Sequence, residues 1–96
     1  MTQTASKLSR DDVVVLRRGV RLQFESSQDR WVLLYPEGMV QLGDTALEVL
    51  KRLDGIRDIN QVIRELDQAY DADTCADVIE FLEIALERLW ITRNAR

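Results

Sequence analysis

The chain has no histidine and a single cysteine, Cys75, among its 96 residues. Because histidine is the commonest general base in enzymes and a frequent metal ligand, its absence argues against acid–base catalysis near neutral pH. Cys75 has no histidine to activate it as a nucleophile and no second cysteine with which to form a disulfide. We interpret it as a small buried residue in a reducing cytoplasm. The sequence therefore predicts a protein that is not an enzyme.

Long apolar segments are lacking as well. No run of about 18 apolar residues is present, which argues against a membrane span, and the N-terminus has no apolar signal-peptide core. No loop shows the glycine pattern that cradles phosphate groups. The acidic pairs Asp11–Asp12 and Asp71/Asp73 are interpreted as solvated charge rather than as a metal site. We therefore expect a cytoplasmic protein with no metal, no cofactor and no membrane contact.

Charge is distributed unevenly along the chain, whose net charge is −4. Residues 1–30 contain six Lys/Arg and four Asp/Glu, whereas residues 31–96 contain seven Lys/Arg and thirteen Asp/Glu. A mildly basic beginning on an acidic body lacks the basic stripe that binding to a nucleic-acid backbone requires. The sequence therefore predicts no nucleic-acid partner.

The length and the 46% hydrophobic content suit one domain with a small core. Residues 1–12 are mostly polar and show little periodicity, so we expect them to form a flexible N-terminal arm. The patterned region spans residues 13–91 and is predicted to be a single domain. Residues 92–96 are then expected to form a C-terminal tail.

The first half of the domain is predicted to form a three-stranded antiparallel sheet. Apolar and polar residues alternate over 20–25, which is typical of a half-buried strand. Residues 30–35 are apolar on both faces, as expected for the central strand. Pro36 and Gly38 favour a tight turn into a third strand at 39–42.

Three helices are predicted in the second half. The first runs from about Asp44 to Asp54, where Gly55 suits the C-terminal cap. The second follows Asp58, and the third follows Thr74 and runs to about Trp90. Both are expected to begin with capping boxes between residues three apart, Asp58 with Gln61 and Thr74 with Asp77.

The third helix has an unusually wide apolar arc, covering roughly half of its circumference. The arc consists of Val78, Leu82 and Leu89 near its centre, Phe81 and Ala85 on one side, and Ile79, Leu86 and Trp90 on the other. Ile84 stands alone among acidic residues on the opposite face. A helix needs a stripe of only about 100° to pack on one core. Two interpretations remain open, a helix wrapped by its own core and a helix that partly lines a ligand groove.

We interpret the third strand, 39–42, as having an unpaired outer edge. Such an edge presents free N–H and C=O groups, and beside a helix it can capture an extended peptide by strand addition. Residues 13–16 could instead cover the edge, or two copies could form a homodimer by strand exchange. A winged-helix DNA-binding regulator has a similar order of elements, but its recognition helix would here present acidic side chains to phosphates.

The residues of the second half form a moderately specific pattern. It comprises Leu42-Gly43-Asp44-Thr45-Ala46, Leu50, Leu53-Asp54-Gly55, Ile59, Val62-Ile63, Leu66, Tyr70, Val78, Phe81-Leu82 and Trp90-Ile91. With these residues the chain resembles pyrroloquinoline quinone synthesis protein D (PqqD), a group of precursor-peptide recognition domains, over roughly residues 13–91. Gly43 stands where the family usually has Asn, and glycine is a tolerable N-cap. Leu89 stands where many members have Gly, so we expect it to lengthen the third helix and to be buried.

The resemblance implies an α+β, winged helix-turn-helix-like fold, with a three-stranded antiparallel sheet followed by a three-helix bundle. It implies a non-catalytic chaperone that binds the precursor peptide PqqA and presents it to the radical S-adenosylmethionine (SAM) enzyme PqqE. In related domains the peptide adds beside the third strand and lies against the third helix. Carried onto this sequence, the peptide-binding residues are Met39, Val40, Gln41 and Leu42 on the strand and Val78, Phe81, Leu82 and Ala85 on the helix.

Overall fold

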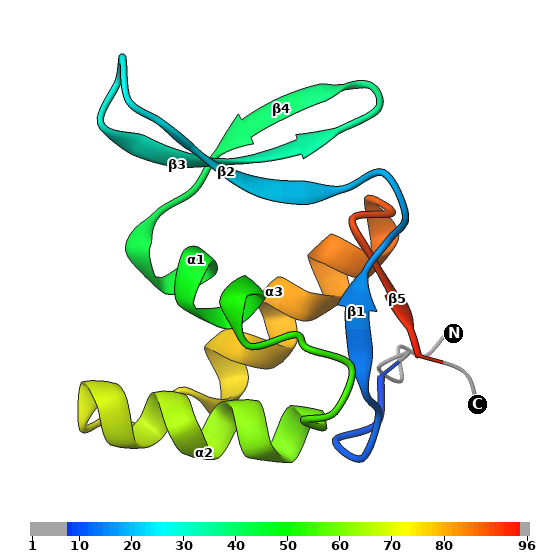
Figure 1. Ribbon diagram of the computed structural model, residues 1–96. Helices are drawn as coiled ribbons and strands as arrows, with labels where there is room; N and C mark the ends of the chain where they lie inside the picture. The colour runs from blue at the N-terminus through cyan, green and yellow to red at the C-terminus, as the bar shows by residue number, and fades with distance from the viewer. Residues whose placement is uncertain (1–7, 95–96) are drawn as a thin grey trace, which may run out of the picture.

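The structure is a computed structural model that describes residues 8–94. Its elements follow in the order β1 (Val14–Leu16), β2 (Arg21–Glu25), β3 (Arg30–Tyr35), β4 (Gly38–Gln41), α1 (Asp44–Lys51), α2 (Ile59–Tyr70), α3 (Cys75–Glu87) and β5 (Ile91–Arg93). The sheet of β2, β3 and β4 forms one layer, and the three helices lie on one side of it (Figure 1). This arrangement confirms the predicted α+β class. None of the helices in the described part of the chain combines the length and apolarity needed to span a bilayer.

The central strand β3 is buried on both faces, as its apolar sequence predicted. β3 pairs antiparallel with β2 on one side and with β4 on the other. Val32 and Leu33 are consecutive, so their side chains point to opposite faces, and both are fully buried. Leu33 joins the core between the sheet and the helices, whereas Val32 lies between Gln23 and Gln41 in the cross-strand register.

A second, two-stranded sheet joins the two ends of the described chain. β1 pairs antiparallel with β5, so that Val14 lies opposite Arg93. The backbone N–H of Asn94 donates to the carbonyl of Val13 at 2.7 Å. The structure therefore corrects the predicted tail, because residues 92 and 93 belong to a strand. A strand of three residues is defined by its distant partner, which a local sequence pattern does not reveal.

The predicted N-terminal arm also differs from the structure. Leu8 is buried in the core. The backbone N–H groups at the start of α2 donate to this segment, Ile59 to the carbonyl of Asp12 at 2.9 Å and Asn60 to that of Arg10 at 3.0 Å. Residues 8–12 therefore pack on the domain. The rest of the predicted arm and tail, residues 1–7 and 95–96, lies outside the described residues.

The first two helices begin where the sequence indicates. The carbonyl of Gly43 accepts the N–H of Leu47 at 3.0 Å, so α1 starts normally without the asparagine that is usual in the family. At α2 the predicted capping box is confirmed, since the carboxylate of Asp58 accepts the N–H of Gln61 at 2.9 Å. α1 ends earlier than predicted, at Lys51, and Gly55 lies in the following connection with φ +84°.

α3 begins directly after Thr74, as predicted, but its N-terminal cap and its C-terminal end differ from prediction. The Thr74 side chain makes no cap hydrogen bond, because its hydroxyl donates to the carboxylate of Asp67 at 2.8 Å instead. The helix ends at Glu87 rather than near Trp90. Leu89 follows with φ +66°, in the left-handed region that favours glycine, and its side chain is 61% exposed. The expectation that Leu89 would lengthen the helix and be buried is therefore wrong, and Trp90 turns back into the core.

Candidate functional site

The outer edge of β4 is open in the described structure. The larger sheet has the strand order β2–β3–β4, so β4 is a terminal strand with β3 as its neighbour. Within residues 8–94 no strand pairs with its other side. The segment that could have covered this edge, residues 13–16, pairs through β1 with β5 instead. An open edge of this kind is able to pair with a further strand.

The hydrogen bonds of β4 show which backbone groups are free to pair. The N–H of Leu42 donates to the carbonyl of Trp31 at 3.0 Å. Because hydrogen-bonded and non-hydrogen-bonded pairs alternate in an antiparallel ladder, Val40 also bonds to β3. Met39 and Gln41, which alternate with these residues, point their N–H and C=O groups away from the sheet. The edge therefore offers two donors and two acceptors to an incoming strand.

A groove of about 420 Å³ runs between this edge and α3. It is lined by Tyr35, Met39, Val40, Gln41, Leu42, Ala46, Phe81, Ile84, Arg88 and Trp90. All four strand residues predicted from the sequence are among them. Phe81 and Ile84 of α3 and its C-cap residue Arg88 line the groove, and their spacing of three and four residues places them on one face of the helix.

Three of the four helix residues predicted for the wall lie elsewhere. Val78, Leu82 and Ala85 are at most 1% exposed and belong to the core, and none of them lines the groove. Phe81 is the predicted wall residue that does line it. The wall residues were carried over from the family resemblance, and the apolar arc itself left core and groove both open. In the structure, Val78, Leu82 and Ala85 belong to the core cluster. Ile84, alone among acidic residues and 40% exposed, was the signal for the groove face.

One end of the groove is aromatic and basic. The rings of Tyr35 and Trp90 lie 6.0 Å apart between their centroids. The guanidinium carbon of Arg88 lies 5.8 Å from the Trp90 ring centroid, within the range of a cation–π interaction. Of the described residues that line the groove, Arg88 alone is charged. None of these three residues was predicted as a site residue, because Tyr35 ends β3 whereas Arg88 and Trp90 lie between α3 and β5, far from it in the sequence.

The helices that support the groove are joined by an ion-pair network away from it. Arg57 and Arg52 donate to the two oxygens of Glu65 at 2.7 and 3.0 Å, and Arg52 also donates to Glu48 at 2.7 Å. The hydrogen bond from Arg57 holds the pKa of the Glu65 carboxyl below its usual range, and that from Arg52 does the same for the pKa of Glu48. The network ties α1 and its following loop to α2.

A second contact joins α2 to the start of α3. The carboxylate of Asp67 accepts both the N–H of Thr74 at 2.7 Å and its hydroxyl at 2.8 Å. The backbone bond, with the hydroxyl bond next, lowers the pKa of the Asp67 carboxyl. This contact holds the residue before α3 against α2.

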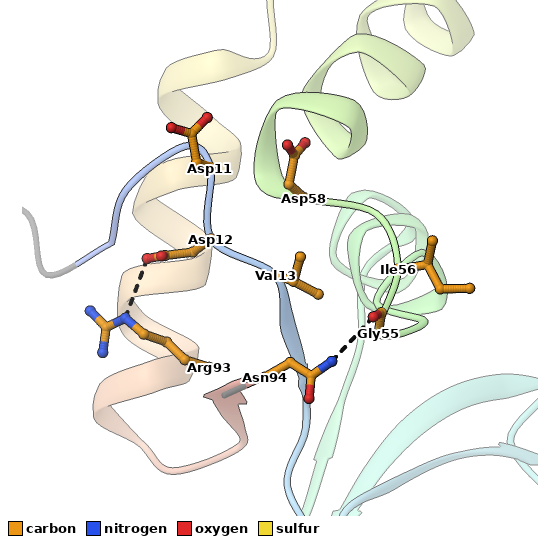
Figure 2. A pocket seen from close by; sticks show the side chains of 8 residues that line it. All are labelled: Asp11, Asp12, Val13, Gly55, Ile56, Asp58, Arg93 and Asn94. Atoms are coloured by element: carbon orange, nitrogen blue, oxygen red, sulfur yellow. Dashed lines mark hydrogen bonds and ion pairs between the residues drawn. The ribbon is translucent and has the colours of Figure 1, made fainter. Parts of the chain in front are cut away.

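A larger hollow, of about 700 Å³, lies between residues 11–13, the loop before α2 and the end of β5 (Figure 2). It is lined by Asp11, Asp12, Val13, Gly55, Ile56, Asp58, Arg93 and Asn94. Its polar side chains join segments that are far apart in the sequence: Arg93 donates to Asp12 at 3.3 Å and Asn94 donates to the carbonyl of Gly55 at 3.1 Å. Among residues 8–94, no group of three His, Cys, Asp or Glu is placed to hold a metal ion. We assign this hollow a structural role.

Known proteins resemble the chain over most of its length. Residues 30–91 match the family described as coenzyme PQQ synthesis protein D (PqqD). The PqqA binding protein of Pseudomonas paraeruginosa is 48% identical over 85 residues, which cover 86% of this chain and 92% of that protein. The PqqA binding protein of Klebsiella pneumoniae is 42% identical over 87 residues, which cover 88% and 95% respectively.

The fold is also found in a solved structure. The solution NMR structure of the PqqD truncation of Methylobacterium extorquens PqqCD matches with a TM-score of 0.77 and 37% identity, over 92% of this chain and 97% of that one. That truncation is described as a functional and stand-alone recognition element for ribosomally synthesized and post-translationally modified peptides. The sequence match and the shared fold together show that this chain belongs to the coenzyme PQQ synthesis protein D (PqqD) family.

Proposed function

We propose that this protein binds the precursor peptide PqqA as an added strand on the open edge of β4 and presents it to the radical SAM enzyme PqqE. The observation that carries the proposal is the position of the edge. The outward N–H and C=O groups of Met39 and Gln41 run along a groove whose opposite wall is α3. Relatives at 42–48% identity are named for PqqA binding, which supports this choice of peptide.

In this geometry, backbone pairing with β4 provides affinity, and side-chain packing in the groove provides selectivity. An added strand lies about 4.8 Å from β4, and its backbone pairs with Met39 and Gln41 whatever its sequence. Alternate side chains of the peptide then point into the groove towards Phe81 and Ile84, where their shape decides how well they pack. A peptide that is disordered when free loses conformational entropy on binding, so it needs both kinds of contact.

The role of the protein in this scheme is not catalytic. It holds the peptide extended and, by also contacting PqqE, raises the local concentration of peptide at the enzyme. DNA binding is less well supported, because Asp77, Glu80 and Glu87 are exposed on α3 and would repel phosphates. Because this surface of α3 is acidic, a peptide is a better-matched ligand than DNA.

Strand addition is tested by a scan of synthetic PqqA peptides, each carrying one N-methylated peptide bond. In a bound strand every second N–H donates to β4, so we expect affinity measured by calorimetry to fall at alternate positions. The intervening positions serve as matched controls with the same chemical change. A loss of affinity without this period of two, or no binding of the unmodified peptide, would contradict the proposal.

A further inference from the structure

Arg88 lines both the groove beside β4 and a neighbouring pocket. It lies beside Trp90 and the turn between β3 and β4. The neighbouring pocket has a volume of about 200 Å³ and is also lined by Arg17, Arg18 and Glu37. In the described part of the chain the Arg88 guanidinium makes no ion pair within 4.0 Å with a carboxylate of the protein. Arg88 is therefore the one charged lining residue of the groove among the described residues, and in the neighbouring pocket it lies with two further arginines and one glutamate.

The opposite end of the same helix face is acidic. Asp77 lies four residues before Phe81, so helical spacing places both on one face, and Glu80 is adjacent. Along this face of α3 the order is thus acidic, apolar at Phe81 and Ile84, and basic at Arg88. A peptide in the groove therefore has acidic side chains of the protein near one of its ends and Arg88 near the other. This difference favours one direction of the peptide over the reverse direction.

We propose, on the basis of the function proposed above, that Arg88 binds an acidic side chain of the docked peptide and thereby fixes its register on β4. The selected peptide carries two apolar residues at alternate positions over Phe81 and Ile84, and an aspartate or glutamate two positions further towards Arg88. The protein thus selects an extended, apolar peptide segment that is followed by an acidic side chain.

The spacing of helix and strand residues supports this pattern. Phe81 and Arg88 are seven residues apart, which corresponds to a rise of about 10.5 Å along α3. Residues on one face of a strand are about 6.8 Å apart, so the third such residue lies about 13.6 Å from the first. The long side chain of arginine spans the remaining difference. An acidic residue placed towards Asp77 instead would meet like charge, which disfavours the shifted register.

The test is a double-mutant cycle between the protein and the peptide, measured by calorimetry. The protein is compared with Arg88→Gln and with the control Arg64→Gln, which removes the same charge from an exposed position on α2. Each Asp and Glu of synthetic PqqA is replaced singly by its amide. We expect Arg88→Gln to weaken binding by about fivefold, and Arg64→Gln to leave it unchanged. One amide peptide should show the same loss on the unaltered protein and no further loss on Arg88→Gln.

Two outcomes overturn the inference, and they are distinguishable. In the first outcome, PqqA shifts the amide resonances of Met39 and Gln41, but each amide peptide loses the same affinity for the unaltered protein as for the Arg88→Gln variant. Arg88 then binds no peptide carboxylate, while strand addition stands. If PqqA leaves these resonances unchanged on the unaltered protein, the proposed function fails and the inference fails with it. The series of amide peptides is measured on the unaltered protein, so this part of the test does not depend on whether the Arg88→Gln variant folds. The one sensitive position of this series should also lose its advantage in 1 M salt, where the Debye length is about 3 Å.

Discussion

Two faces of α3 carry apolar side chains, but these side chains have different surroundings. Val78, Leu82 and Ala85 are buried in the core, whereas Phe81 and Ile84 lie beside the open edge of β4. Both sets of apolar side chains come from the same 13-residue helix. The two sets differ in what lies beside them: one is enclosed by the core, and the other lies beside the edge of β4, which has no strand on its outer side within residues 8–94. The comparison teaches that apolar character alone does not identify a binding face, and it can be tested by mutating each face separately.

The largest effect is expected on the core face. Leu82→Ala removes a fully buried side chain and leaves a cavity, so we expect the free energy of unfolding to fall by about 2–5 kcal/mol. The affinity of the protein that remains folded for PqqA should not change, because Leu82 does not line the groove. Urea unfolding measures the first quantity, and calorimetry at a temperature where the variant is folded measures the second. A large loss of affinity in the folded variant would show that the two faces are not separable.

The edge of β4 comes next. Gln41→Pro removes an outward N–H, so we expect the affinity for PqqA to fall by up to about tenfold, with little change in stability. Gln41→Ala is the matched control, because it keeps the N–H and loses only the side-chain bond to Gln28. Val40→Pro removes an N–H that bonds to β3 and should instead lower the free energy of unfolding. Equal affinities for the proline and alanine variants at position 41 would count against pairing at this edge.

A smaller effect is expected on the groove face of α3. Ile84 is already 40% exposed, so Ile84→Ala should lower the free energy of unfolding by less than about 0.5 kcal/mol. The affinity for PqqA should fall by about fivefold, because the peptide would bury the rest of this side chain. Ile56→Ala is the control, being the same substitution at an isoleucine away from the groove. Equal affinity of the Ile84→Ala and Ile56→Ala variants for PqqA would contradict the claim that Ile84 contacts the bound peptide.

The smallest effect concerns the ion pairs between α1 and α2. The pKa of Glu65 is lowered in the folded protein, chiefly by Arg57, so its contribution to stability is complete above the unfolded pKa of about 4.3 and is lost as pH falls through the folded value. Glu65→Gln should lower the free energy of unfolding at pH 7 by less than about 1 kcal/mol. It should also reduce the loss of stability on acidification, as followed by urea unfolding at several pH values. Parallel pH profiles for the two proteins would contradict this account, and PqqA affinity at pH 7 should be equal.

The parts of the fold that could be predicted depend on residues close in sequence. The alternation over 20–25, the turn at Pro36 and Gly38, and the pairing of Asp58 with Gln61 each involve neighbours, so the sheet and the second helix were predicted correctly. The pairing of β1 with β5 was not, because its partners are separated by most of the chain and each strand has three residues.

The residues that line the groove were predicted in part for the same reason, and their role in binding a peptide stays a prediction. The edge residues 39–42 follow from the strand pattern, and all of them line the groove. The groove face of α3 depends on how α1 and α2 cover the opposite face, which no local pattern records. Arg88, the C-cap of α3, lines the groove through its helical spacing from Ile84. Trp90 follows Leu89, whose left-handed conformation comes after the helix ends, and nothing in a leucine predicts that conformation.

Amide hydrogen exchange at β4, with and without PqqA, tests the central claim most directly. In the free protein the N–H of Val40 should exchange slowly because it bonds to β3, and those of Met39 and Gln41 should exchange rapidly because they face the open edge. With saturating PqqA, Met39 and Gln41 should become protected while Val40 remains as it was. Rapid exchange of Met39 and Gln41 in the presence of bound peptide, or slow exchange in its absence, would contradict the account.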